Sequence, residues 1–488
     1  MNKLKLIVLL ILVCLIFAAC SPENKNPADN SNDWKDAVSN ENVNGEEVTE
    51  PPYWDILGEK DFGGDTFTII DAVNDPSWHY NMALEITGEP INDGLYNRDR
   101  FIEEKYNVQI KYIQMVGAGV GCKSIENAVA AGMLEYDLAI ASIFGNNFNV
   151  ISLRGVLYNM IDIPNLSLES PWWSKMIYEN MKYDNKIYYT GGDIYLPTFS
   201  QGADVMMFNK NLFQDRGIRD NLYEMVFDGK WTLDVFERLI KDTDTDLNND
   251  GKLHASDDFF GIVYPNNTEY MSGFFSGAGA KFSTTTADGE LIVDLNTPTN
   301  LMKLDKLAGM LKKINYNNQD DPIMKTFKEN RSLFLVHCML SPQRMLRDME
   351  SDYGILPMPK WDEAQESYVS LMNGWGGGYV GIPANTDIEK SGFLTEAMAY
   401  AGYEMLREPV YEITFAAKAA RDEESERIID IIIETAYMDI NHIYNFGDTQ
   451  DMILQTILNK KDFVSSYEKK EAVIEKDIAK YISSISPE

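Results

Sequence analysis

Thr66-Phe-Thr-Ile-Ile70 is the first of three short runs that decide the fold, because β-branched and aromatic residues crowded in this way are typical of strands. The second run is Asn107-Val-Gln-Ile-Lys-Tyr-Ile113, in which apolar and polar residues alternate. The third is Tyr136-Asp-Leu-Ala-Ile-Ala-Ser142, which is mostly apolar. The sequence therefore predicts three strands within the first third of the chain.

Two segments with a helical pattern separate these strands. Residues 93–106 carry apolar residues at helical spacing among mixed charges, and residues 124–134 read as a helix with Ser124 as its N-cap. Strands that alternate with helices of this length predict a parallel sheet and an α/β domain. Ligands of such sheets bind at the carboxyl ends of the strands, so we expect binding residues in the loops 71–80 and 142–148.

The N-terminus has the pattern of an export signal. Lys3 and Lys5 form a short basic region, residues 6–17 are an apolar run of signal-peptide length, and Ala18-Ala19 precede Cys20. Small residues directly before a cysteine resemble the lipobox of bacterial lipoproteins. The resemblance implies that Cys20 is lipidated and becomes the first residue of the mature protein, with residues 1–20 as the lipoprotein signal peptide.

Phe17 departs from the leucine that a lipobox usually has, so a plain secretory signal stays as the alternative. Residues 21–52 are dominated by Asn, Ser, Asp, Glu and Pro, and we expect a disordered tether there. No later segment approaches the length of a membrane-spanning helix, so the lipid is the only membrane attachment that we expect. These features predict a protein on the extracellular face of the bacterial cell membrane.

Size and charge limit what the exported part can be. The segment after residue 52 is too long for one small core, which favours two domains. The chain has 76 acidic and 43 basic residues, and this excess of negative charge argues against nucleic acid as a partner. Cys122 and Cys338 are the cysteines beyond Cys20, and we expect the core rather than a disulfide framework to stabilise the protein.

Motifs of common enzyme classes are missing from the sequence. It contains no G-x-S-x-G elbow, no H-E-x-x-H pair and no P-loop. Residues 376–381 satisfy G-x-G-x-x-G, but Pro383 follows where a dinucleotide site needs the start of a helix. We therefore expect no catalysis and no catalytic residue, although carboxylates are so numerous that a glycoside hydrolase stays as a minor alternative.

One local motif predicts a structural calcium ion. Residues 246–257 follow the EF-hand spacing, with the expected ligands Asp246, Asn248, Asp250, the Lys252 carbonyl and Asp257. Asp257 replaces the usual glutamate at position 12, and His254 occupies position 9. The alternative is a solvated turn of Asn and Asp residues. No other cofactor is expected.

Several segments together resemble the extracellular solute-binding proteins of the sugar-binding class. The N-terminal signature is the segment Glu85-Ile-Thr-Gly-Glu-Pro-Ile-Asn-Asp-Gly-Leu-Tyr-Asn-Arg-Asp-Arg100, followed by Glu103-Glu-Lys-Tyr-Asn-Val-Gln-Ile110. The further matches, in order, are Phe208-Asn-Lys-Asn-Leu-Phe213, Gly229-Lys-Trp-Thr-Leu-Asp234, Tyr353-Gly-Ile-Leu-Pro-Met-Pro359 and the glycine-rich segment 373–381. Each segment is weak evidence by itself, but their order along nearly the whole mature chain is specific.

The resemblance implies a two-lobed, periplasmic-binding-protein-like α/β fold whose lobes close on ligand about a hinge. By analogy, the chain first crosses between lobes near residues 191–193 and returns near Gly374. Lobe one would comprise residues 53–190 plus 374–430, and lobe two residues 191–373 plus 431–488.

The resemblance also implies a function. We expect a lipid-anchored, monomeric receptor without chemistry of its own, which binds a carbohydrate, such as an oligosaccharide, and delivers it to an ABC permease. A receptor for peptides or other small solutes is the first alternative, and an enzyme that degrades surface polysaccharide is the second.

Sugar sites combine exposed aromatic rings with polar side chains, and this rule selects candidate ligand contacts near the expected cleft. Ordinary packing in the core is the alternative for each aromatic residue among them. The candidates are Trp78, Phe144, Asn146, Asp193, Asn266, Asn267, Tyr270 and Trp375.

Overall fold

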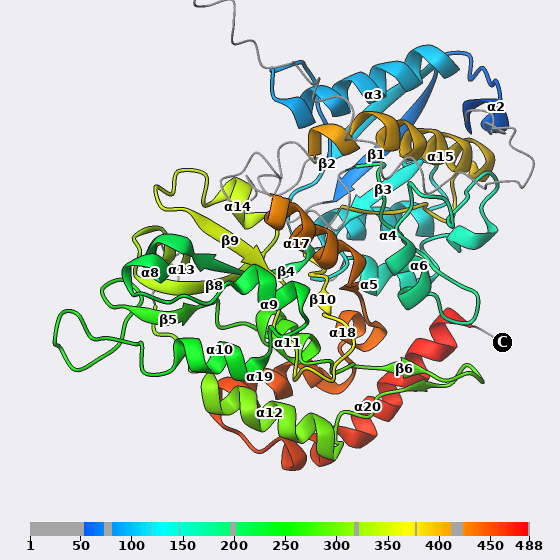
Figure 1. Ribbon diagram of the computed structural model, residues 1–488. Coiled ribbons are helices and arrows are strands. Elements are labelled where there is room, and N and C mark those ends of the chain that lie inside the picture. Colours follow the sequence, from blue (N-terminus) through cyan, green and yellow to red (C-terminus); the bar gives the residue numbers. More distant parts are fainter. Residues whose placement is uncertain are drawn as a thin grey trace, which may run out of the picture. The chain divides into compact units, whose positions relative to one another are not determined.

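The computed structural model describes most of the chain beyond the expected tether (Figure 1). The described residues are 53–72, 81–117, 119–145, 147–195, 202–316, 322–375, 378–410 and 423–486. The expected signal peptide and tether lie outside them. The chain divides into two units, residues 1–58 and 59–488. The first contributes only the short helix α2 (Tyr53–Leu57), and the second holds every other element given below. Within the described part, no helix combines the length and the apolar character that crossing a membrane requires.

The first sheet has the strand order β11-β3-β1-β2. Strand β1 (Asp65–Ala72) pairs in parallel with β2 (Val108–Gln114) on one side and with β3 (Leu138–Ala141) on the other. Strand β11 (Tyr379–Gly381) lies antiparallel to β3. The three strands predicted from the sequence and their parallel arrangement are therefore confirmed.

The crossover helix α3 (Pro90–Tyr106) begins and ends at clear signals. The side chain of Glu89 accepts a hydrogen bond from the backbone N–H of Asn92 at 2.8 Å, which caps the first turn. Pro90 occupies the first helical position, where the missing N–H costs nothing. Asn107 adopts the left-handed conformation at φ 48° and ends the helix directly before β2.

Ser124 is not the N-cap of the second crossover helix, so that prediction was wrong. Helix α4 (Val120–Ala130) begins four residues earlier, after Gly119 at φ 72°. Its first turn packs so closely on β1 that a Cβ at Gly121 would lie 2.7 Å from the Cα of Ala72. This close packing extends the helix toward its N-terminus, and the Ser124 hydroxyl instead bonds with the hydroxyl of Tyr136 at 2.9 Å.

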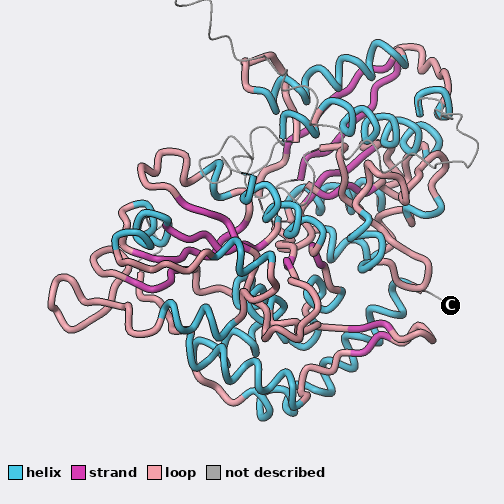
Figure 2. The backbone as a smooth tube through the Cα atoms, viewed as in Figure 1, coloured by secondary structure: helices cyan, strands magenta, loops and turns pink. Residues whose placement is uncertain are grey.

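The second sheet has the order β5-β8-β4-β9 and is mixed. Strand β4 (Asp204–Asn209) is antiparallel to both β8 (Ser332–Cys338) and β9 (Tyr353–Leu356), and β5 (Phe260–Val263) is parallel to β8. All six residues of β4 are buried, as expected for a central strand covered on both faces. Figure 2 shows the strands of the two sheets as separate groups.

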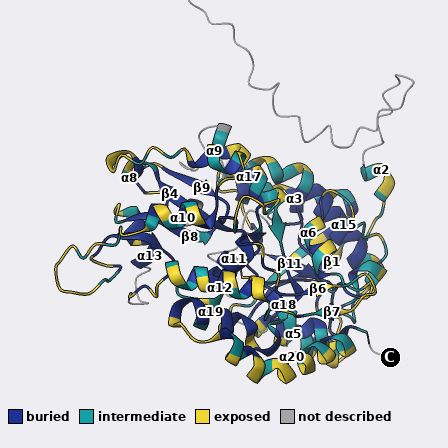
Figure 3. Cartoon of the chain, turned by 60° about the horizontal axis from the view of Figure 1, so that its bottom comes forward, coloured by how far each residue is buried: buried dark blue, intermediate teal, exposed yellow. Residues whose placement is uncertain are grey.

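Helices from distant parts of the chain cover the two sheets. Helix α15 (Ile388–Met405) packs on α3 beside the first sheet, whereas α17 (Glu423–Glu434) packs on β9 of the second. Helix α11 (Thr268–Gly277) is buried from Glu269 onward between its neighbours, while the helices around it expose one face to solvent (Figure 3). It contacts α19 (Thr449–Asn459) and α12 (Pro298–Met310).

The remaining elements are short or lie at the periphery. The helices are α5 (Phe148–Ile151), α6 (Lys175–Met181), α8 (Lys210–Asp215), α9 (Leu222–Phe227), α10 (Leu233–Ile240), α13 (Pro322–Lys328), α14 (Ser341–Arg344), α18 (Ile440–Tyr444) and α20 (Phe463–Ile485). The 3-10 turns are η4 (Ser152–Arg154), η5 (Met160–Asp162) and η7 (Phe446–Asp448). Two small sheets pair β6 (Thr284–Thr285) with β7 (Leu291–Ile292), and β10 (Ser370–Leu371) with β12 (Ala436–Tyr437).

Candidate functional site

The loop after β3 meets the segment before β11 through an aromatic pair. The backbone N–H of Ile143 donates to the carbonyl of Gly374 at 3.1 Å, which holds the two segments side by side. The ring centroids of Phe144 and Trp375 lie 6.0 Å apart, at an interplanar angle of 51°. Phe144 is buried, whereas Trp375 keeps 44% of its surface exposed. Trp375 is therefore positioned to offer a free ring face to a ligand.

Two glycines make this arrangement possible. A Cβ at Gly374 would lie 2.7 Å from the ring of Phe144, and a Cβ at Gly145 would lie 2.7 Å from Cζ3 of Trp375. Gly145 also has φ 72°, a conformation that favours glycine. The side chain of Asn373 accepts a hydrogen bond from the backbone N–H of Trp375 at 2.9 Å and fixes the turn.

His442 of α18 connects the aromatic pair to the buried helix α11. Its ring stands edge-on to Phe144, with 5.4 Å between centroids. His442 is fully buried, and neither ring nitrogen has a hydrogen-bond partner among the described residues. Its Nε2 lies 3.6 Å from Oε1 of Glu269. Burial lowers the pKa of His442 to about 3, so the ring is neutral at physiological pH.

Asp204, the first residue of β4, lies against the same face of α11 as Glu269. A Cβ at Gly273, one turn after Glu269, would lie 2.6 Å from Oδ2 of Asp204. Both carboxyl groups are buried. Within the described part of the chain, neither oxygen of Asp204 has a hydrogen-bond partner, and Oε1 of Glu269 has none. We call Asp204, Glu269 and His442, with Asn373, Phe144 and Trp375, the Asp204–Glu269 cluster.

The electrostatics of the two acids follow from their burial. Loss of solvation is the main cause that raises the pKa of each carboxyl, and the charge of Asp204 raises the pKa of Glu269 further. Asn373 lies close enough to lower the pKa of Asp204, but it forms no hydrogen bond of ordinary length with that carboxyl. Unpaired buried carboxyls are costly, so these oxygens are suited to accept hydrogen bonds from a ligand.

The predicted ligand contacts are distributed unevenly about this cluster. Phe144 and Trp375 belong to it. Trp78 and Asn146 lie outside the described residues. Tyr270 follows Glu269 on α11 and is buried, and its ring lies 5.1 Å from that of His337 between centroids, at an interplanar angle of 41°.

Asp193, Asn266 and Asn267 already have partners within the protein. The Asp193 carboxylate accepts a hydrogen bond from Nε of Arg407 at 2.7 Å. Asn266 bonds to both the N–H and the carbonyl of Ile314, at 3.0 and 2.6 Å. Asn267 caps α11 by accepting from the backbone N–H of Tyr270 at 3.2 Å. A ligand role for these three residues stays a prediction.

The loop 246–257 is closed by hydrogen bonds to its own backbone. Asp246 accepts from the N–H groups of Asn249 and Gly251, at 2.7 and 2.8 Å. Asn248 accepts from Asp250, whose carboxylate accepts from Lys252, at 2.9 and 2.8 Å. Among the described residues no group of three or more His, Cys, Asp or Glu side chains is arranged to hold a metal ion. The calcium site stays a prediction.

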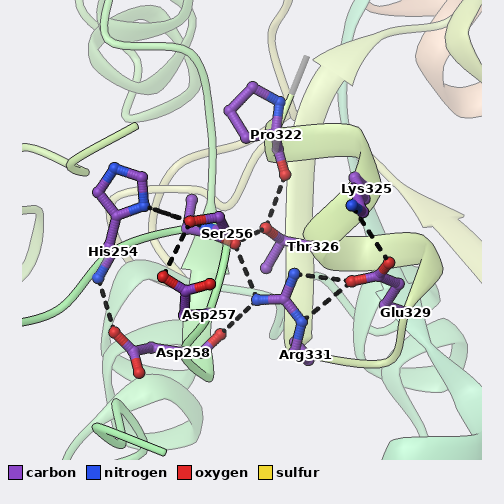
Figure 4. A network of polar contacts seen from close by, with 10 residues as sticks. His254, Ser256, Asp257, Asp258, Pro322, Lys325, Thr326, Glu329 and Arg331 are labelled. Carbon is purple, nitrogen blue, oxygen red and sulfur yellow. Dashed lines mark hydrogen bonds and ion pairs between the residues drawn. The ribbon is translucent and has the colours of Figure 1, made fainter. Parts of the chain in front are cut away.

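Asp258, one position beyond the expected ligand Asp257, forms hydrogen bonds to both sides of this loop. Its two carboxylate oxygens accept from the N–H groups of Leu247 and His254, at 2.9 and 2.8 Å. Figure 4 shows the base of the loop, where the Arg331 guanidinium donates to the carbonyl of Asp258 at 2.9 Å. Asp257 instead accepts from the Ser256 hydroxyl at 3.1 Å.

An open groove of about 590 Å³ lies apart from the cluster, between α10, β5 and the end of α12. Its walls include Lys241, Tyr264 and Lys312. No residue of the Asp204–Glu269 cluster lines this groove, so it is not part of the candidate site.

Sequence reasoning missed Asp204, Glu269 and His442. A carboxylate at the start of the buried strand Asp204-Val-Met-Met-Phe208 is the one signal that could have identified Asp204. Glu269 lies between two residues that the pattern did select, Asn267 and Tyr270. His442 carries no spacing signal, because its partners are distant in the chain.

No family model and no curated protein matches the sequence. Solved structures of similar architecture do exist. They include the maltose-binding protein MalE of Listeria monocytogenes in complex with maltose (14% identity, TM-score 0.55, covering 85% of this chain and 98% of that one). They also include the Bdellovibrio bacteriovorus MalE domain bound to maltotriose (16%, TM-score 0.53, 85% and 100%) and the Listeria monocytogenes ABC substrate-binding protein Lmo0181 in complex with cycloalternan (13%, TM-score 0.53, 85% and 99%).

These similarities extend over most of this chain and nearly all of each other chain, so they concern the whole architecture and not one shared domain. At identities of this size they establish the fold. The structure itself has two separate sheets, and the first of them includes β11, a strand from late in the chain. These findings together bear out the fold expected from the sequence. The protein has the two-lobed, periplasmic-binding-protein-like α/β fold of the sugar-binding solute-binding proteins.

Proposed function

We propose that the chain is a member of the sugar-binding solute-binding proteins and captures a carbohydrate, in the first instance an oligosaccharide, at the Asp204–Glu269 cluster. The observation that carries this proposal is that one cluster contains both buried acceptor oxygens, on Asp204 and Glu269, and an exposed aromatic ring, that of Trp375. Sugars offer hydroxyl donors together with apolar C–H faces, so both halves of the cluster have a counterpart on such a ligand.

The position of the cluster in the fold supports this proposal. Phe144 follows a strand of the first sheet, whereas Asp204 begins the central strand of the second. Trp375 lies on the segment that leads back to the first sheet. A ligand held among these residues would contact both sheets, and binding would therefore favour a closed arrangement of the lobes.

The remaining parts of the proposed function come from the sequence. The mature protein would be held at the extracellular face of the cell membrane by a lipid on Cys20, act as a monomer, and deliver its ligand to an ABC permease. It would carry out no chemistry itself and need no catalytic cofactor. Similarity to binding proteins and the missing enzyme motifs support this part of the proposal.

The test is a binding screen of the mature protein against neutral and charged oligosaccharides, with the recovered ligand analysed for cleavage. We expect at least one oligosaccharide to bind and to be recovered intact. Binding should weaken in Trp375→Ala and persist in Trp361→Phe, a change of a tryptophan that the site does not include.

Three outcomes would contradict the proposal. Cleavage of a glycan would identify an enzyme acting on polysaccharide. Tight binding of peptides without any sugar would identify a receptor for another solute class. Sugar binding that is unaffected by Trp375→Ala would place the site elsewhere.

A further inference from the structure

The described histidine, cysteine and tyrosine side chains around Asp204 and Glu269 carry no charge near neutral pH. Burial lowers the pKa of both His337 and His442 to about 3 and raises that of the Cys338 thiol to about 11. The phenols that face the pair, Tyr270 on α11 and Tyr379 on β11, have a pKa raised well above the ordinary value by burial. Every one of these groups is therefore neutral.

No cation of the described chain compensates the two acids. Among the described residues, the basic side chain within ion-pair distance of either carboxyl is His442, 3.6 Å from Glu269, and its ring is neutral. The described lysines and arginines that are buried have other surroundings. Arg98 pairs with Asp99 at 2.6 Å, Lys360 donates to the carbonyl of Gln365 at 2.8 Å, and Lys303 lies on α12, where its electrostatic partner is Asp362.

Two buried carboxyls in this position can be satisfied in two ways. One is to retain protons, which the raised pKa of Asp204 and Glu269 makes available in the free protein. The other is to exchange one of those protons for an external cation that also donates hydrogen bonds, because a charge-assisted hydrogen bond is stronger than a neutral one. An ammonium group has three N–H donors and no acceptor. It therefore matches a pair of carboxylates, whose oxygens accept hydrogen bonds and cannot donate them.

We propose that Asp204 and Glu269 form a subsite for the protonated amine of a basic sugar, so that the ligand of this protein is an amino-sugar oligosaccharide. This inference rests on the proposed function and narrows its ligand class. On binding, the pair of carboxyl groups releases one proton to solvent and one ligand ammonium takes its place, while the second proton stays shared between Asp204 and Glu269. The amine keeps its own protons, so charge and atoms balance.

Glucosamine oligomers and their N-acetylated counterparts of equal length provide a matched pair of probes. They share the same backbone and differ in the charge of one substituent per ring. We expect the free-amine oligomer to bind about tenfold tighter or more, which corresponds to about 1.4 kcal/mol. Its binding should release protons, measured calorimetrically in buffers of different ionisation enthalpy, whereas the acetylated oligomer should release none.

Asp204→Asn and Glu269→Gln test the two acids without changing side-chain size. Each should reduce the preference for the free amine to within about threefold, with binding of the acetylated oligomer retained. The apo variants should melt at or above the wild-type temperature, because each change removes an unpaired buried acid. Glu366→Gln, which changes an exposed glutamate, is the control and should keep the full preference.

The outcomes separate this inference from the proposed function. Equal binding of the two oligomers, or tighter binding of the acetylated one, would overturn the amine subsite while leaving sugar capture intact. Binding of neither oligomer nor of any other sugar would overturn both. A lower melting temperature in both apo variants, with the amine preference unchanged, would make the acids a structural pair and would also overturn the subsite.

Discussion

The indole of Trp375 lies over Gly145, with so little space that a Cβ on residue 145 would come within 2.7 Å of Cζ3. The two residues come from segments far apart in the chain, one after β3 and the other before β11. The absence of a side chain at residue 145 therefore sets where the exposed ring stands, and changes at either residue should alter the same face of the site.

Trp375→Ala should weaken ligand binding by about tenfold or more, because truncation of an aromatic anchor typically costs about 2 kcal/mol. The ring is 44% exposed, so its loss should affect stability less than loss of a buried tryptophan. Trp231, which is fully buried, is the contrast, and Trp231→Ala should cost about 3–5 kcal/mol. Calorimetry and apo melting curves measure both effects. Large destabilisation with unchanged affinity would make Trp375 a core residue.

Gly145→Ala should reduce affinity to a similar degree by displacing the indole. Gly155→Ala is a matched control, because both glycines have a positive φ (72° and 66°) but a Cβ at Gly155 would meet no atom within 4 Å. Both changes should destabilise the protein by about 1–2 kcal/mol, the cost of the left-handed conformation. Only Gly145→Ala should also weaken binding. Equal affinities in the two variants would argue against a role for the Trp375 position.

Arg407→Gln should destabilise the protein in a pH-dependent way. The change leaves the buried Asp193 carboxylate without its cation, and loss of one partner from a buried pair costs about 3–5 kcal/mol, with the lower value expected because Arg407 is partly exposed. In the wild type, burial raises the pKa of Asp193 to about 6 despite Arg407. Without Arg407 this pKa rises further.

The sign of the pH dependence follows from linkage. A carboxyl with a raised pKa binds more protons in the folded state, so its contribution to stability is present at low pH and is lost as the pH rises through the folded pKa. The destabilisation by Arg407→Gln should therefore shrink below about pH 5 and be full near pH 8. Adding Asp193→Asn should restore much of the stability at high pH. A loss of stability that is independent of pH would mean that Arg407 acts through packing.

Chelation should lower the melting temperature if residues 246–257 bind calcium, and the shift should grow with calcium concentration by mass action. Asp246→Asn with Asp250→Asn should abolish this dependence while keeping oxygens that accept the loop's own N–H groups. The alanine pair should abolish it as well and should also weaken the turn. An unchanged wild-type melting curve after chelation would identify the loop as a polar turn held by Asp258.

Cys20→Ala should leave an uncleaved or shed protein that no longer partitions with the detergent phase. One acyl chain gives only marginal membrane attachment, whereas the several chains of a lipoprotein hold firmly. Cys14→Ala, within the apolar run of the signal, is the control and should partition as the wild type does. Detergent-phase partitioning of Cys20→Ala at the wild-type level would contradict lipidation at Cys20.

Local pattern was sufficient to predict the first sheet. Alternation and β-branched composition located β1, β2 and β3, and the helices between them required a parallel order. The start of α4 was missed because packing of Gly121 on Ala72 outweighed the capping preference of Ser124. Tertiary packing of this kind cannot be predicted from the local sequence.

The candidate site was predictable only in its aromatic half. Glycines around Trp375 indicated an accessible ring, whereas Asp204 and Glu269 stand at the start of a strand and in the first turn of a helix, where a lone acid is typical of the beginning of an element. Their proximity depends on how β4 packs against α11. Asn266 and Asn267 follow an apolar run as ligand-binding residues often do, yet their side chains fasten a loop and cap a helix.

The two cysteines of the folded part have a practical consequence for testing whether the proposed lobe closure occurs. Cys122 lies on α4 beside the first sheet and Cys338 ends β8 of the second, and both are free and buried. Burial raises the pKa of these thiols to about 12 and about 11, so the reactive thiolate is scarce at neutral pH. A cysteine introduced on the surface of each lobe could therefore accept a maleimide dye without removal of the native pair. Energy transfer between two such dyes would then test whether the two lobes open and close when a ligand is added.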